Sequence, residues 1–313
     1  MAGQEWATAG LGGTLTSETL SRNLRIVAQP KMRFRQLTKL EMAFGAHNGD
    51  TVTFKKVGNV ATEGRIIGEK EAVPETNITF TSDTCTINEY SNSIPYTWKL
   101  SLLAKLSVED AIIIALMNDM AKVLDKAAAA PFRTADLVYT PTGTSANPTR
   151  TIATNGTAGA TATRNVGTWD VMNIVDQMRS TYNMPAYDGN DYLCVASTTF
   201  LRGLKNDSQW IEAAKYGAPD KLFSGEVGKY YGVRFIEENN ALTNSLSGGL
   251  GEAIFIAADA VMEIVAYAEE VQAKLAGQYG RDQGLRWVWM GGFKKTWSFS
   301  TDAQARLFRV YSL

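Results

Sequence analysis

Two strand-like segments separated by a long polar stretch constrain the fold of this chain more than any other feature. Residues 51–54 (Thr-Val-Thr-Phe) alternate with the two-residue period of a strand, and a second strand-like run covers residues 77–90. The stretch between them is rich in charge and glycine and ends near Pro74. The pattern predicts a long two-stranded hairpin over residues 49–97 with a polar tip.

The length of this hairpin limits where it can lie. Strands of about 15 residues extend roughly 50 Å. A compact chain of 313 residues has a radius of gyration of roughly 20 Å. An isolated two-stranded ribbon is only marginally stable in water. The hairpin therefore either folds back over its own domain or projects and is buried by another molecule, for which a second copy of the chain is the simplest candidate.

The clearest helix follows the hairpin. Ser107 is the expected N-cap, and Glu109 and Asp110 in the first turn favour the helix dipole. Apolar residues recur at helical spacing from residue 108 to residue 127, and Pro131 is expected to end the helix after about 24 residues, or roughly 36 Å. We interpret this helix as the backbone of a domain, with its apolar face in the core.

The rest of the chain predicts a mixed α+β fold. Residues 140–167 are rich in Thr, Ala, Gly and Asn and are expected to form an exposed loop or hairpin at an internal boundary. Residues 168–260 mix short helices with apolar strands, which indicates an α/β lobe with a central sheet. Residues 261–313 are mostly strand-like, and Trp287 and Trp289 are expected to share one face of a sheet.

Charge is nearly balanced over the whole chain but not along it. The net charge of −1 excludes a dedicated nucleic-acid-binding domain, which usually carries a basic excess. Residues 21–40 nevertheless contain no Asp or Glu and carry six basic residues: Arg22, Arg25, Lys31, Arg33, Arg35 and Lys39. This stretch is either a solvated helix face or linker, or a basic arm that contacts phosphates or an acidic neighbouring subunit.

The sequence contains no recognisable catalytic, cofactor or metal site. Its one histidine, His47, lies in a loop context beside Asn48 and Gly49, where no triad or general base is indicated. Glycine-rich phosphate loops and nucleophile elbows do not occur. Cys85 and Cys194 are too few for a disulfide framework or a zinc site. We therefore predict a structural protein rather than an enzyme, with no cofactor.

The apolar runs and the N-terminal residues indicate where in the cell the protein is made. The longest apolar run, residues 111–117, is far shorter than a membrane span, and residues 1–6 lack the features of a signal peptide. We expect a protein that is made in a cytoplasm and has no membrane partner.

The order of these parts resembles the major capsid proteins of tailed bacteriophages. Residues 61–64 (Ala-Thr-Glu-Gly), 78–80 and 88–90 (Asn-Glu-Tyr) are similar to the extended-loop segment of the coat proteins of N-four-type podoviruses. The best match covers residues 222–237, where two glycines precede a turn, Gly232-Val233-Arg234 and an apolar strand. The resemblance covers most of the chain, from about residue 20 to residue 313.

The resemblance implies the phage major capsid protein fold and its domain order. The expected parts are an N-terminal arm (1–48), an extended hairpin loop (49–97), a peripheral domain with a long spine helix (98–167), an axial α/β domain (168–260) and a return to the peripheral domain (261–313).

The resemblance also implies a function. The chain would assemble with itself, in hexamers and pentamers, into an icosahedral shell around packaged double-stranded DNA. Portal and scaffolding proteins would be partners, and a decoration protein could join them. The protein would be made in the host cytoplasm and would reside in the virion. An encapsulin-like compartment shell, which shares the fold, is the alternative.

Residues of the arm and of the hairpin are the candidates for contacts between subunits. They are Arg22, Arg25, Arg33 and Arg35 in the arm and Phe54, Glu63, Arg65, Glu69 and Lys70 in the hairpin. No covalent cross-link between subunits is predicted.

Overall fold

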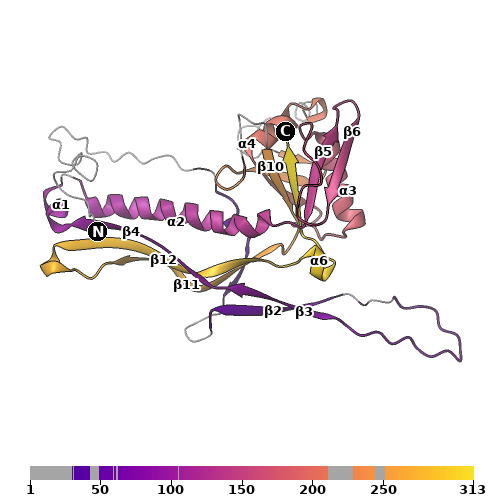
Figure 1. The fold of residues 1–313 in the computed structure, drawn as a ribbon, viewed down its shortest axis with the longest axis horizontal. Helices are drawn as coiled ribbons and strands as arrows, with labels where there is room; N and C mark the ends of the chain where they lie inside the picture. The colour runs from indigo at the N-terminus through magenta and orange to yellow at the C-terminus, as the bar shows by residue number, and fades with distance from the viewer. Residues whose placement is uncertain are drawn as a thin grey trace.

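The computed structural model describes residues 30, 32–42, 49–58, 60, 63–104, 106–210, 228–243 and 251–313. Figure 1 shows an elongated molecule in which one long helix, α2 (Val108–Arg133), runs along a four-stranded sheet. A seven-stranded sheet lies at the C-terminal end of that helix, and a two-stranded ribbon lies on the far side of the four-stranded sheet from the helix. The mixed α+β class predicted from the sequence is confirmed.

The four-stranded sheet has the order β1-β11-β12-β4. Its strands are β1 (Lys39–Met42), β11 (Val261–Ala273), β12 (Asp282–Lys295) and β4 (Asn88–Thr97). β1 pairs in parallel with β11, and the other pairs are antiparallel. Trp287 and Trp289 are both buried against Ile112 and Leu116 of α2, as their two-residue spacing predicts.

Helix α2 joins the two sheets. The side chain of Ser107 accepts the backbone N–H of Asp110 at 3.3 Å, which confirms the predicted N-cap. The predicted end at Pro131 is wrong, because the helix continues to Arg133. A proline this close to the C-terminus of the helix removes only one hydrogen bond. The last turn of α2 is held by the buried ring of Phe132, which packs against Phe34 with ring centroids 5.3 Å apart.

The seven-stranded sheet has the order β6-β5-β13-β10-β7-β9-β8. Phe255 of β10 faces helices α3 (Thr168–Asp176) and α4 (Thr198–Lys205), whereas its neighbours Ile254 and Ile256 face the end of α2. The alternation buries both faces of the central strands. The strands are β5 (Leu137–Gly143), β6 (Pro148–Ala153), β7 (Tyr192–Ala196), β8 (Gly228–Tyr230), β9 (Val233–Glu237), β10 (Gly251–Ile256) and β13 (Leu307–Ser312).

Two domain boundaries predicted from the sequence are wrong. Residues 140–167 contain a hairpin with an exposed turn, as predicted, but they are not a domain boundary, because β5 and β6 extend the seven-stranded sheet. Residues 261–313 do not all return to the peripheral domain, because β13 lies between β5 and β10 in the same sheet. Both errors arise because these strands pair with partners far away in the chain, which local composition does not reveal.

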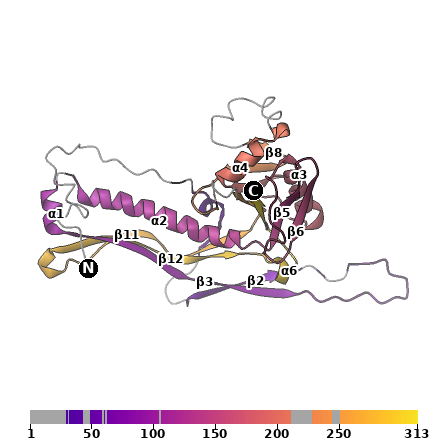
Figure 2. The same cartoon turned by 45° about the horizontal axis from the view of Figure 1, so that its top comes forward.

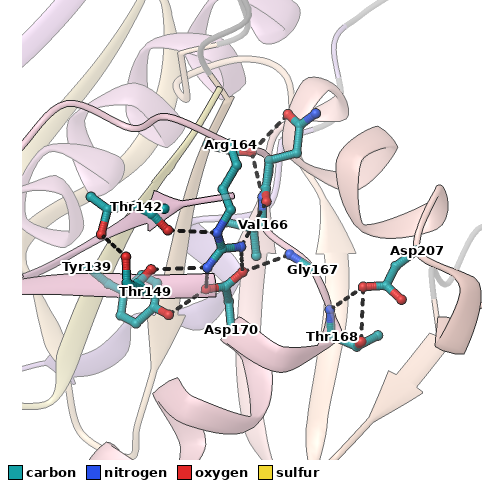
Figure 3. Close-up of polar contacts among 12 residues, drawn as sticks. Tyr139, Thr142, Thr149, Arg164, Val166, Gly167, Thr168, Asp170 and Asp207 are labelled. Atoms are coloured by element: carbon teal, nitrogen blue, oxygen red, sulfur yellow. Dashed lines mark hydrogen bonds and ion pairs between the residues drawn. The ribbon is translucent and has the colours of Figure 1, made fainter. Parts of the chain in front are cut away.

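A buried ion pair fixes the irregular segment that follows β6. The guanidinium of Arg164 makes two hydrogen bonds to the fully buried carboxylate of Asp170, at 2.5 and 2.6 Å, and also reaches the carbonyl oxygens of Thr142 and Thr149 (Figure 3). The hydroxyl of Tyr139 donates to the same carboxylate at 2.6 Å. Burial and the adjacent Asp170 charge raise the pKa of Tyr139, so its phenol stays a donor.

A second buried carboxylate, Glu252, lies on β10 between two arginines. Its Oε1 accepts hydrogen bonds from Arg309 at 2.7 Å and Arg133 at 3.2 Å, and its Oε2 accepts the backbone N–H of Thr243 at 3.0 Å. Burial alone would raise the pKa of Glu252, but these donors and positive charges outweigh it and lower that pKa below its ordinary value.

Acid is therefore expected to weaken this domain through Glu252. Because the folded-state pKa lies below the unfolded-state pKa, the stabilisation is fully present above the unfolded value and is lost as the pH falls through the folded value. Urea unfolding of the unassembled chain between pH 7 and pH 3 should show a smaller pH-dependent loss for Glu252→Gln than for the parent. Equal pH dependence in the two chains would contradict this assignment.

The hairpin is shorter than predicted. β2 (Thr51–Val57) pairs antiparallel with β3 (Phe80–Thr86), and residues 63–79 between them have no regular secondary structure. The predicted continuous strand over residues 77–90 is wrong, because Ile87 separates β3 from β4 and β4 pairs with β12 instead. The hairpin therefore ends near residue 87 rather than residue 97, and the part beyond it belongs to the four-stranded sheet.

Candidate assembly interface

The base of the hairpin is anchored on its own chain. Val52 and Cys85 are buried against Met262 and Ile264, which project from the face of β11 opposite to α2. Lys56, on the same face of β2 as Val52, makes a buried ion pair with Asp302 at 2.7 Å. The β2–β3 ribbon is therefore part of the folded subunit, which accounts for its stability where an isolated ribbon would be marginal.

The outer part of the hairpin projects beyond the rest of the molecule in both views (Figures 1 and 2). We call residues 57–80 the extended loop. The Ile66 side chain is 98% exposed, and the loop carries further exposed apolar residues at Val57, Val60, Val73, Ile78 and Phe80. Exposed apolar surface of this extent makes the segment a candidate contact surface for another macromolecule.

Polar contacts within the extended loop are local. Arg65 forms an ion pair with Glu71 at 2.6 Å, and the Glu71 side chain also accepts the backbone N–H of Gly68 at 3.3 Å. Both ends of the Arg65–Glu71 pair are exposed, so it contributes little to stability. These contacts shape the tip without attaching it to the body of the subunit.

The structure places the predicted interface residues in three situations. Four of them, Glu63, Arg65, Glu69 and Lys70, are exposed on the extended loop, which leaves them free to contact a partner. Phe54 is half-buried at the hairpin base and Arg33 is exposed beside the anchored end of the arm. Arg22, Arg25 and the lone histidine His47 lie outside the described residues.

Arg35, which was predicted to contact a neighbouring subunit, is bonded within its own chain. Its guanidinium donates two hydrogen bonds to Glu263 of β11, at 2.9 and 3.0 Å, and forms a further ion pair with Glu269. It also lies over the Trp289 ring, 5.7 Å from the centroid. All three partners belong to the same chain, so Arg35 fastens the end of the arm to its own four-stranded sheet.

A second exposed apolar surface, which sequence reasoning missed, lies at the end of the molecule remote from the seven-stranded sheet (Figure 1). There the short helix α1 (Trp98–Leu103) lies against the β11–β12 turn, and the backbone N–H of Trp98 donates to the Arg281 carbonyl at 3.1 Å. We call this surface the apolar tip. Its exposed side chains are Trp98, Leu102, Leu103, Leu275 and Tyr279.

The turn at the apolar tip holds Tyr279 in a conformation that costs free energy. Gln278 and Tyr279 are consecutive residues with φ of 48° and 60°, a region that residues other than glycine rarely adopt. Each such residue costs on the order of 1–3 kcal/mol, and strain of this kind concentrates at functional sites. Neither residue is the glycine or asparagine usual at such positions, although Gly277 and Gly280 flank them.

Within the ranges given above, no group of three or more His, Cys, Asp or Glu residues could hold a metal ion. No helix in the described part of the chain is long and apolar enough to cross a membrane.

Comparison of the sequence with protein families identifies the family of this chain. Residues 12–205, more than half of the chain, match the model of the phage capsid family. The chain belongs to the phage capsid family. It is a structural shell protein and not an enzyme, as the sequence predicted. No curated protein matches the sequence.

Solved capsid structures share the fold over nearly the whole chain. The capsid of Ralstonia phage GP4 matches with a TM-score of 0.67 and 16% identity, covering 95% of this chain and 94% of that chain. The Cyanophage Pam1 capsid matches with a TM-score of 0.68 and 13% identity, over 95% and 96% of the two chains. The head of Helicobacter pylori bacteriophage KHP40 gives 0.68 and 14%, over 95% of each.

These matches confirm the capsid fold predicted from the order of the parts. The finer likeness to coat proteins of N-four-type podoviruses stays a prediction. Within the motif that suggested it, residues 228–237 form β8, a turn and β9, and residues 222–227 lie outside the described residues. The turn explains its glycine, because Tyr231 and Gly232 have φ of 48° and 76°, as a tight hairpin turn requires.

Proposed function

We propose that this chain forms the wall of an icosahedral phage shell in which the extended loop of each subunit lies over a neighbouring copy. The observation that carries this proposal is the contrast along the hairpin. Its base is buried on its own subunit, whereas Val57, Val60, Ile66, Val73 and Phe80 are exposed beyond it. A partner that buries these side chains must be present wherever the protein acts, and in a shell the neighbour is another copy.

The remaining expectations belong to the same proposal. Subunits would assemble as hexamers and pentamers, enclose packaged double-stranded DNA, and work with portal and scaffolding proteins and a decoration protein. Synthesis in the host cytoplasm precedes assembly. The net charge of −1 suits a wall that surrounds DNA without holding it tightly. Membership of the phage capsid family favours this function over an encapsulin-like compartment.

Particles purified from cells that produce the whole virus test this function. We expect closed shells of uniform size by electron microscopy, with this chain as the main component and with DNA inside that resists added nuclease. Shells that contain a cargo enzyme and no protected DNA would support the compartment instead. A chain that stays a monomer of 34.2 kDa with its scaffolding protein present would contradict both.

The apolar tip gives a further expected result within this proposal. Leu102→Asp together with Leu275→Asp should leave the unassembled chain nearly as stable as the parent, because both side chains are exposed. The charges should reduce shell yield at least about tenfold, since placing unpaired charges in an apolar contact costs several kcal/mol. Thermal unfolding and the particle fraction on a sucrose gradient measure the two effects. Normal yield would show that the tip remains in solvent.

A further inference from the structure

The base of the hairpin contains a buried ion pair, Lys56–Asp302, that plays no part in the contact proposed between the extended loop and a neighbouring subunit. The side chains of Lys56 and Asp302 are only 5% and 3% exposed, and the Lys56 ammonium lies 2.7 Å from the Asp302 carboxylate. The rings of Phe54 and Trp297 lie 5.6 and 5.7 Å from the same ammonium. A buried lysine is costly unless it is paired, so this geometry fixes both partners in place.

Three segments meet at the Asp302 carboxylate. Lys56 of β2 and Thr81 of β3 both donate to it, the second at 2.9 Å, and so does the backbone N–H of Ser298 at 3.0 Å. Asp302 is the last residue of the short helix α6 (Phe299–Asp302), which lies between the ribbon and the seven-stranded sheet (Figures 1 and 2). Both strands of the ribbon are therefore tied to α6.

Helix α6 is fastened in turn to the seven-stranded sheet. The side chain of Asp136, immediately before β5, accepts the backbone N–H of Phe299 at 2.7 Å and the hydroxyl of Ser298 at 3.1 Å. The Phe299 ring packs edge-on against Tyr182, with centroids 5.5 Å apart, beside the core of that sheet. The ribbon thus contacts the four-stranded sheet through apolar side chains and the Asp83–Lys294 ion pair, and it is linked to the seven-stranded sheet through α6.

We propose that the Lys56–Asp302 pair couples the direction of the extended loop to the position of the seven-stranded sheet, so that the loop and the two sheets move together. The coupling is a property of the single chain. Its consequence rests on the proposed function, because in a shell the loop direction sets the angle between neighbouring subunits, and a uniform angle gives a uniform diameter.

Hydrogen exchange on the unassembled full-length chain tests the coupling. In Asp302→Asn the buried ammonium loses its nearer carboxylate and keeps only Asp83, at 3.7 Å, so amides of β2 and β3 should exchange about tenfold faster or more, while amides of β12 stay unchanged. Lys294→Met is the comparison variant, because it removes a half-exposed ion pair, Lys294–Asp83 at 3.2 Å, that links the same ribbon to β12 and not to α6. Unchanged exchange in Asp302→Asn would overturn the coupling.

Two further variants protect the test against misfolding. Thr81→Val removes only one donor to Asp302 and should raise exchange in β3 by a smaller factor within a folded chain. Lys56→Met combined with Asp302→Leu replaces the pair with apolar groups and should restore slow exchange in the ribbon. Two results for Thr81→Val would overturn the role proposed for the Asp302 carboxylate. One is fast amide exchange across the whole chain, and the other is exchange in β3 that is no faster than in the parent.

Shell diameters test the consequence separately. Electron microscopy should show a broader range of diameters for Asp302→Asn shells than for Lys294→Met shells. Faster exchange combined with uniform diameters would overturn the link from loop direction to shell curvature. If the parent chain forms no shell at all, the proposed function fails, whereas the exchange experiment still decides whether the pair couples the ribbon to the sheet.

Discussion

Deletion of residues 60–76 is expected to leave a folded subunit that no longer forms closed shells. The ribbon below the deletion keeps its strand pairs and the hydrogen bond from the Gly58 N–H to the Thr79 carbonyl. The polar side-chain contacts of the deleted segment that the structure describes, such as Arg65 with Glu71, are internal to it. The loss therefore falls on the contact between subunits, which we expect to reduce shell yield by at least about a hundredfold.

Thermal unfolding of the unassembled chain and the particle fraction on a gradient measure this result. A length-preserving variant, Ile66→Ser with Val73→Ser and Ile78→Ser, should also fail to assemble if apolar contact drives the interaction. Replacing Ser145 and Ala146 in the exposed β5–β6 turn with glycine serves as the control and should assemble normally. Unfolding of the deletion variant would mean that the extended loop belongs to the core of its own subunit.

Removal of the Asp170 carboxylate is expected to have the largest effect on the stability of the subunit itself. Asp170→Ala leaves the buried guanidinium of Arg164 without a counter-ion and the hydroxyl of Tyr139 without its acceptor. Breaking a buried pair in this way costs about 3–5 kcal/mol. Because single domains are stable by only about 5–15 kcal/mol, the variant should unfold at much lower urea concentrations.

Two comparisons make the Asp170 result specific. Glu71→Gln removes the exposed partner of Arg65 and should change the free energy of unfolding by less than about 0.5 kcal/mol. Arg164→Met combined with Asp170→Leu replaces the buried pair with apolar side chains and should recover much of the lost stability. If Asp170→Ala lowers the free energy of unfolding by less than about 1 kcal/mol, the Arg164–Asp170 pair is not what holds residues 154–167 in place.

Local signals in the sequence predicted the parts of the fold that are formed locally. Ser107 followed by acidic residues marked the start of α2, and the spacing of Trp287 and Trp289 placed both on the buried face of β12. The capsid fold itself was predicted from the order of such parts, since a long helix and a hairpin are each visible within one window of sequence.

The features that the sequence did not predict depend on pairing across long distances. β13 joins β5 in parallel, about 170 residues away along the chain, so no local pattern could reveal it. The role of Arg35 within its own chain was missed because its partner Glu263 lies more than 200 residues further on, and the same separation hides the pairing of Lys56 with Asp302. The apolar tip was missed because exposure of Leu275 depends on what the fold leaves uncovered.

A photo-activatable cross-linking residue in place of Ile66 tests the central claim most directly. Ile66, at 98%, is the most exposed of the apolar residues that the structure describes in the extended loop. Irradiation of assembled shells, followed by denaturing electrophoresis, should give covalent multimers of this chain, and peptide mapping should locate the link on a different copy. Products that are only monomers linked within one chain would contradict the account.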